Sequence, residues 1–111
     1  MIKGVHAMFY SPAADELRAF FKEKLGLDWF DAGGNWPIYP IAGEVGCHEA
    51  DGNSAGISFY CDDVAATVES LKARGVVFAG DIEDHGYGLV TFFEAPGGLK
   101  IQLYQPRYSK P

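Results

Sequence analysis

The sequence predicts an α+β domain built from two similar βαβββ halves. Residues 6–10 align with residues 56–60, and each stretch is followed by a helix-start signal, an amphipathic stretch and a glycine. Short strand-like runs follow each predicted helix rather than alternating with further helices, which is the order typical of α+β proteins. The chain has 111 residues, so we predict a single domain over residues 1–111, with modules at 1–52 and 53–111.

The first half opens with a predicted strand over residues 2–10, where polar and apolar residues alternate. Ser11 is the predicted N-cap of the helix that follows, because Pro12 suits the first helical position. Gly26 ends this helix, since glycine is favoured just after a helix terminus. The apolar residues of the helix recur at helical spacing: Leu17, Phe20, Phe21 and Leu25.

Three short strands are predicted after this helix, at residues 27–30, 36–41 and 44–49. Turn-forming residues at 33–35 and 42–43 separate them. The first half therefore has the order strand, helix and three strands.

The second half repeats this order. A strand is predicted at residues 56–60, followed by a helix capped by Asp62 or Asp63 and ended by Gly75. Three further strands are predicted at 76–79, 89–94 and 99–104. Residues 95–98, with proline followed by glycine, predict a type II turn between the last two strands.

Composition excludes several classes of function. The formal net charge is -6, and an acidic surface repels phosphate backbones, so we expect no nucleic-acid partner. The first apolar stretch is interrupted by Lys3 and His6 and is too short to span a bilayer, so we expect no membrane partner and a cytoplasmic location. Cys47 and Cys61 lie in apolar runs and are expected to be buried thiols.

Four segments, taken in order, resemble the vicinal-oxygen-chelate superfamily, which has the glyoxalase, bleomycin-resistance and extradiol-dioxygenase fold. They are residues 5–6, 20–27, 59–64 and 94–103, and the last is the most specific. The resemblance implies a curved mixed sheet around a cavity, with the helices on the outer face. It also implies a homodimer in which both chains build the cavity.

Metal-using members of that family place one ligand on each of four strands. The corresponding positions here are His6 on the first strand, Gly56 on the fifth and Gln102 on the last. Strand alternation favours His48 over Glu49 on the fourth strand, with Glu49 as the alternative. Glycine has no side chain, and an amide is a weaker ligand than a carboxylate for a hard dication. We therefore expect no metal cofactor. Zinc, nickel, manganese or iron bound by His6, His48 and Gln102 remains the alternative.

The same alternation predicts the other side chains that face the cavity. They share strands with the family's ligand positions: Met8, Tyr10, Ser58, Tyr60, Lys100 and Tyr104. Trp36, Tyr39 and Phe93 are further candidates for an aromatic wall.

Two functions follow from the resemblance. The first is a small-molecule-binding protein of the bleomycin-resistance type, which sequesters a drug or metabolite at the dimer interface without a full metal site. The alternative is a metal-dependent glyoxalase-like lyase, isomerase or dioxygenase that uses His6, His48 and Gln102. In that case Tyr10, Tyr60 or Tyr104 is a candidate proton donor. The sequence assigns no catalytic residue and does not name the ligand.

Overall fold

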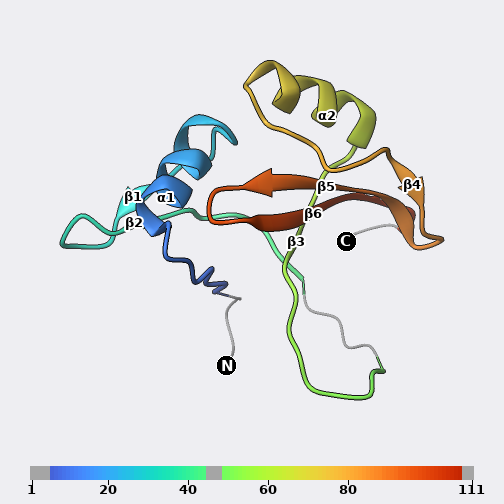
Figure 1. The fold of residues 1–111 in the computed structure, drawn as a ribbon, viewed down its shortest axis with the longest axis horizontal. Helices are drawn as coiled ribbons and strands as arrows, with labels where there is room; N and C mark the ends of the chain where they lie inside the picture. Colours follow the sequence, from blue (N-terminus) through green and yellow to red (C-terminus); the bar gives the residue numbers. More distant parts are fainter. Residues whose placement is uncertain (1–5, 45–48, 109–111) are drawn as a thin grey trace.

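The computed structural model describes residues 6–44 and 49–108 of the chain. It contains two helices and six strands within these ranges, and the α+β class is confirmed (Figure 1). The helices are α1 (Ala14–Glu23) and α2 (Val64–Ala73). The strands are β1 (Phe30–Asp31), β2 (Pro37–Ile38), β3 (Ser58–Tyr60), β4 (Glu83–Asp84), β5 (Gly88–Ala95) and β6 (Leu99–Pro106). Within the described ranges, neither helix is long and apolar enough to cross a membrane.

The main sheet is open, curved and mixed, as the sequence predicts. Its strand order is β3-β6-β5-β4, with β3 parallel to β6 and the other neighbours antiparallel. β5 and β6 form its centre and pair over their full length, from Gly88 opposite Pro106 to Ala95 opposite Leu99. Gly97, in the turn between them, has a φ of 87°, as the third residue of a type II turn requires.

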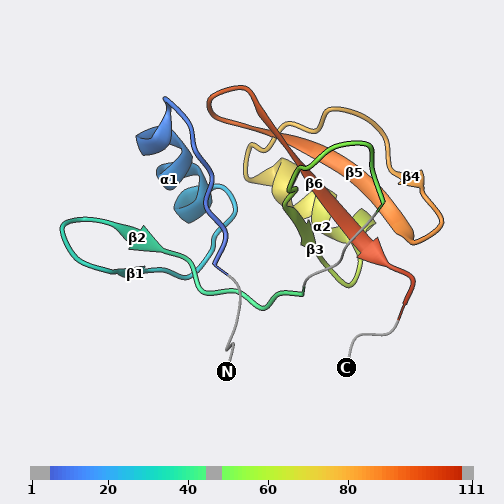
Figure 2. The ribbon, with the colours of Figure 1, turned by 90° about the horizontal axis from the view of Figure 1, so that it is seen from below.

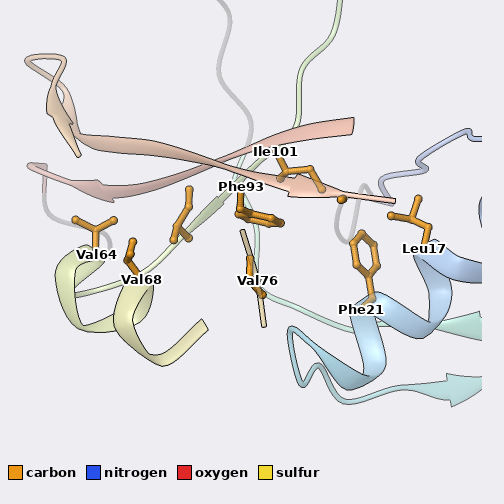
Figure 3. Packing of buried hydrophobic residues seen from close by; sticks show 9 residues of the cluster. Leu17, Phe21, Val64, Val68, Val76, Phe93 and Ile101 are labelled. Carbon is orange, nitrogen blue, oxygen red and sulfur yellow. The ribbon is translucent and has the colours of Figure 1, made fainter. Parts of the chain in front are cut away.

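Both helices pack on the same face of this sheet (Figure 3). Val64 and Val68 of α2 and Leu17 and Phe21 of α1 are buried against it. The strand residues on this face are paired across the sheet, because opposed residues of antiparallel strands point to the same side. They include Phe93 opposite Ile101 and Thr91 opposite Leu103.

Phe93 belongs to this core, and its predicted place in an aromatic cavity wall is wrong. The side chain is only 1% exposed. Its ring stacks with those of Phe20 and Phe59 and meets the ring of Phe78 edge-on. Phe93 lies opposite Ile101 in the sheet, so it must point toward the helices and away from the other face.

Helix α1 begins later than the sequence predicts. Ala13 occupies the N-cap position without a capping side chain, so the assignment of Ser11 as the N-cap is wrong. The Ser11 hydroxyl instead accepts a hydrogen bond from the Ala13 N–H, at 3.0 Å, and orders the turn before the helix. After the helix, Gly26 adopts a φ of 66°, the left-handed conformation that ends helices.

Arg74, just beyond α2, joins the ends of the two helices. Its Nε donates to the Lys24 carbonyl oxygen at 2.7 Å, and its Nη2 donates to the Glu23 carbonyl oxygen at 2.8 Å. A β-carbon at Gly26 would lie 2.7 Å from Nη2, so glycine at this position also makes room for the arginine. We call this contact the Arg74 clamp.

The first half of the chain has less strand structure than predicted. Residues 6–10 form no strand, and β1 and β2 are an isolated two-residue pair joined by a turn at 33–35. The strand expected at 44–49 lies mostly outside the described residues. A strand is stabilised by hydrogen bonds to a neighbour, and no strand within the described ranges pairs with residues 6–10.

The second half follows its prediction more closely. Asp63 is the N-cap of α2, and its carboxylate accepts a hydrogen bond from the Ala66 N–H at 3.0 Å. Residues 76–79 are reduced to a single bridge, between Phe78 and Phe93. Cys61 is a partly buried thiol, and burial raises its pKa. Cys47 lies outside the described residues.

Candidate functional site

Figure 2 shows helix α1 and strands β1 and β2 to one side of the main sheet. A large open cavity is lined by residues of the first half of the chain and of the β3 edge of that sheet. Its volume is about 1760 Å³. The walls come from the segment before α1, the inner side of α1, residues 36–44, residues 54–60 and the adjoining side chains of β6. Both halves of the sequence therefore contribute to one site.

Most of the residues predicted at the site line this cavity. They are His6, Met8, Tyr10, Trp36, Tyr39, Ser58, Tyr60, Gln102 and Tyr104. Tyr10 is 86% exposed and Trp36 is 45% exposed, so these rings stand at an open wall. Lys100 is exposed and is not among the lining residues. It pairs with Glu94 near the turn between β5 and β6, which carries it beyond the cavity.

Of the two alternatives on the fourth strand, His48 lies outside the described residues. Glu49 is exposed and is not among the lining residues.

The register of β3 against β6 places two pairs of cavity-lining residues side by side. Ser58 lies beside Gln102, and Tyr60 lies beside Tyr104. Between them, Phe59 packs on the core side, where its ring stacks with that of Phe93. Alternation along β3 therefore sends one side chain to the core and its neighbours to the face that borders the cavity.

Tyr104 and Tyr108 share a hydrogen-bond network with Glu44. The two phenol oxygens are 2.7 Å apart, and the Glu44 carboxylate accepts from Tyr104 at 3.4 Å and from Tyr108 at 2.5 Å. The hydrogen bond with Tyr104 is the main reason that the pKa of Tyr108 is raised to about 12. Because a phenol is neutral below its pKa, Tyr108 keeps its proton and donates at neutral pH.

Further rings gather around Tyr104. The ring centroid of Tyr60 lies 6.4 Å from that of Tyr104, and the centroid of Tyr87 lies 5.7 Å from it, both edge-on. Gln102 donates from Nε2 to the Tyr87 hydroxyl at 2.9 Å. We call Tyr60, Tyr87, Tyr104 and Tyr108 the tyrosine cluster.

Sequence reasoning missed Tyr87, Tyr108 and Glu44 as site residues. Tyr108 has the same strand parity as Gln102 and Tyr104, so extending the last strand by a few residues would have found it. Glu44 is 64 positions from Tyr108 in the chain, and no local pattern announces such a contact.

The opposite wall carries a positive charge. The Arg18 guanidinium carbon lies 4.6 Å from the centre of the Trp36 ring, a cation–π contact. Arg18 also pairs with Asp15 at 3.2 Å. The Tyr39 hydroxyl donates to the Arg18 carbonyl oxygen at 2.8 Å, and burial raises the pKa of Tyr39.

The described donors do not fit the family's metal site. Gly56 offers no side-chain ligand atom, and Gln102 offers a neutral amide oxygen, a weaker ligand for a hard dication than a carboxylate. Within residues 6–44 and 49–108, no group of three or more histidine, cysteine, aspartate or glutamate side chains could hold a metal ion. In the described part of the chain, His6 and the alternative Glu49 are the imidazole and the carboxylate at family ligand positions, and His6 is the one of the two that lines the cavity.

Comparisons with solved structures give the same fold. The antibiotic-binding protein TnmS3 from Streptomyces sp. CB03234 is 20% identical, with 96% of this chain and 99% of that chain covered, at a TM-score of 0.60. A glyoxalase/bleomycin resistance protein/dioxygenase from Nocardioides is 15% identical, covering 91% and 82%, at a TM-score of 0.60.

A third structure is a variant of the fosfomycin resistance protein FosX from Listeria monocytogenes. It was solved in complex with Mn(II) and 1S,2S-dihydroxypropylphosphonic acid. It is 17% identical to this chain, with 96% of this chain and 92% of that chain covered, at a TM-score of 0.57.

The family assignment comes from the sequence itself. No curated protein matches the chain. The model of the Glyoxalase/Bleomycin resistance protein/Dioxygenase superfamily matches residues 5–103, nearly the whole chain. The chain therefore belongs to this superfamily, as the resemblance of its four segments indicates.

Proposed function

We propose that this protein binds a small organic molecule in the large cavity and holds it without a full metal site. The observation that carries the proposal is the lining, which is mostly apolar and aromatic with a few polar and charged groups among them. Small-molecule sites in proteins have this composition. TnmS3, which shares the fold, is described as an antibiotic-binding protein, which supports a drug or metabolite as the ligand here.

We further propose that a second copy of the chain completes the cavity. Drug-sized sites usually have volumes of roughly 300–1,000 Å³, and this cavity is larger and open to solvent. Several apolar side chains on its walls are exposed: Met8, Tyr10, Trp36, Ile41 and Tyr108. Apolar surface of this kind is stabilised when a partner covers it. A homodimer would reduce the volume and exclude water from the ligand.

Binding without a metal is supported by the donors at the family's ligand positions. A dication needs anionic or imidazole ligands, and Gly56 and Gln102 provide neither. The phenol, amide and carboxylate groups of the site can instead hold a ligand directly by hydrogen bonds.

Ligand-induced thermal shifts test the binding proposal. A compound that binds only the folded state at a concentration one hundredfold above its Kd stabilises it by about 2.7 kcal/mol. For a domain of this size each kcal/mol corresponds to roughly 4–8 °C in Tm. A panel of cationic, neutral and anionic aromatic compounds should therefore contain compounds that raise Tm. A panel without any such compound would contradict the proposal.

Sedimentation equilibrium across protein concentration tests the second copy. We expect a dimer, and we expect Trp36→Ser to shift the equilibrium toward the monomer because it removes an exposed apolar ring. Glu69→Ser, on the exposed face of α2 and outside the cavity lining, serves as the control. A monomer at all concentrations would refute this part of the proposal.

The alternative is a metal-dependent lyase, isomerase or dioxygenase that uses His6, His48 and Gln102. Of these, His6 and Gln102 line the cavity, and His48 lies outside the described residues. Elemental analysis after loading with zinc, nickel, manganese and ferrous iron separates the two proposals. Stoichiometric metal that is lost in His6→Ala would favour the metal-dependent enzyme over the metal-free binding protein.

A further inference from the structure

The tyrosine cluster brings four phenol rings from separate segments to one end of the cavity. Tyr60 comes from β3, Tyr87 from the residue before β5, Tyr104 from β6 and Tyr108 from the segment after it. All four rings line the cavity wall. Glu44 lies at the hydroxyls of Tyr104 and Tyr108, and Gln102 lies at the hydroxyl of Tyr87. Ring surface and one carboxylate therefore face the same space.

Two of the rings meet the ring of Tyr104 edge to face. The planes of Tyr60 and Tyr87 are inclined by 62° and 68° to the plane of Tyr104. Aromatic side chains from different segments that gather at one site are the residues that form cages for ammonium groups. Each ring face is negatively polarised and attracts a cation placed within about 6 Å of it.

The charges of the cavity favour a cation at this end. Glu44 supplies a carboxylate, which accepts from the Tyr108 hydroxyl, and the Tyr104 hydroxyl lies within hydrogen-bond distance of both. Among the described lining residues, Arg18 carries the one permanent positive charge, and it lies at the opposite wall against Trp36. The net charge of the chain is -6, so the surrounding field also attracts cations.

We propose that the tyrosine cluster with Glu44 is a subsite for an organic cation, such as a quaternary or tertiary ammonium group of the ligand. This inference rests on the proposed role of the cavity as a small-molecule site and names the charge class of its ligand. The apolar wall toward Met8 and Trp36 would take the uncharged part of the same molecule.

Benzyltrimethylammonium and its uncharged carbon isostere, neopentylbenzene, form the test pair, because they share shape and differ in charge. Binding to the full chain is measured by saturation-transfer NMR and calorimetry. We expect the cation to bind at least tenfold more tightly than the isostere at low salt. We expect this preference to shrink as salt is added, since Glu44 is close to the solvent-exposed mouth.

Variants then assign the site. Tyr87→Leu should weaken binding of the cation by about five- to thirtyfold, the range expected for losing a cation–π contact. Tyr87→Phe keeps the ring and should retain most of the affinity. Tyr10→Leu is the matched control, because Tyr10 lines the cavity but lies outside the cluster. Glu44→Gln should weaken binding of the cation by several-fold and leave the affinity for the isostere unchanged. The Tm of each variant shows whether it is folded.

The outcomes separate this inference from the proposed function. Equal binding of the two probes, or binding of the isostere alone, overturns the cation subsite and leaves the cavity as a small-molecule site. Equal losses in Tyr10→Leu and Tyr87→Leu overturn the assignment to the tyrosine cluster. If neither probe binds while other aromatic compounds raise Tm, the inference fails by itself. If no compound of any charge binds, the proposed function fails with it.

Discussion

The two halves of the chain have similar sequence patterns and reach different degrees of order. The second half forms two strands of eight residues, β5 and β6, besides the shorter β3 and β4, and it supplies nearly all of the buried core. The first half forms strands of two residues, and only Leu17 and Phe21 of its described residues are fully buried. Alternating residues therefore form a strand only where a neighbouring strand pairs with them through backbone hydrogen bonds.

The neighbours differ because of topology. β5 and β6 are joined by a short turn and pair directly with each other, so their contacts join residues that are close in sequence. Residues 6–10 would need a partner strand from elsewhere, and Phe9 is their main contact with the core, through the rings of Phe21 and Phe59. A second copy of the chain, as proposed above, would supply cover on this side.

The largest expected effect is at the centre of the second half. Phe93→Ala should lower the free energy of unfolding by about 3–5 kcal/mol, because it leaves a cavity among three packed rings. Phe21→Ala, in the first half, should cost less, about 3 kcal/mol, since Phe21 also borders the open cavity. Urea unfolding measures both. Equal losses would mean that the first half is as tightly packed as the second.

The helix caps offer a smaller contrast. Asp63→Ala should cost about 1 kcal/mol, because it removes the side-chain hydrogen bond to a helical N–H of α2. Ser11→Ala should cost less, about 0.5 kcal/mol, because its hydrogen bond lies in the turn before α1. The two variants are compared by thermal unfolding. A larger loss of stability in Ser11→Ala than in Asp63→Ala would mean that the Ser11 hydrogen bond stabilises the start of α1 as strongly as an N-cap does.

Removing the Arg74 clamp tests how the halves are joined. Arg74→Ala should lower stability by about 0.5–1 kcal/mol, because two hydrogen bonds to the end of α1 are lost at an exposed site. Lys72→Ala, in the last turn of the same helix, is the control for the loss of a positive charge near its end. Chemical denaturation checks both variants. Equal losses of stability in the two variants would mean that the positive charge near the end of α2, and not the Arg74 clamp, stabilises the fold.

The smallest effect concerns the turn between β1 and β2. The Gly33 and Trp36 N–H groups donate to the Asp31 carboxylate at 2.8 and 3.0 Å and hold its pKa below the usual value. A lowered pKa in the folded state stabilises the fold above the unfolded pKa of about 4, and this is lost as pH falls through the folded value.

Asp31→Asn should therefore flatten part of the decline in Tm between pH 6 and pH 3. Thermal unfolding across this range measures it, and NMR titration of the Asp31 carboxyl locates the folded pKa. An identical pH profile for the variant and the parent would contradict the contribution of this turn.

The sequence predicts the second half of the fold well. The strands predicted at 89–94 and 99–104 lie within β5 and β6. Of Asp62 and Asp63, the two caps proposed for the second helix, Asp63 is correct. β4 was missed because Glu83 and Asp84 are charged, and two residues give no alternation. The strand at 2–10 was predicted from alternation, but of residues 6–10 Phe9 alone is half-buried, and Ala7, which has the same parity, is exposed.

The site could be predicted only as far as strand alternation reaches. Ser58, Tyr60, Gln102 and Tyr104 were placed by parity along two strands, and they line the cavity. The contact of Tyr108 with Glu44 depends on how a loop returns to the sheet, which alternation does not encode. The roles of these residues stay predictions until ligands are measured.

The Arg74 clamp has a consequence for which residues of the chain can vary. It joins the C-terminal ends of α1 and α2 through the carbonyl oxygens of Glu23 and Lys24. Every amino acid has a carbonyl oxygen, so the side chains at these two positions can change without removing an acceptor. Gly26 is constrained in a way that Glu23 and Lys24 are not, because a β-carbon there would lie 2.7 Å from the Arg74 guanidinium. The joint between the two halves therefore depends on the identity of one arginine and one glycine.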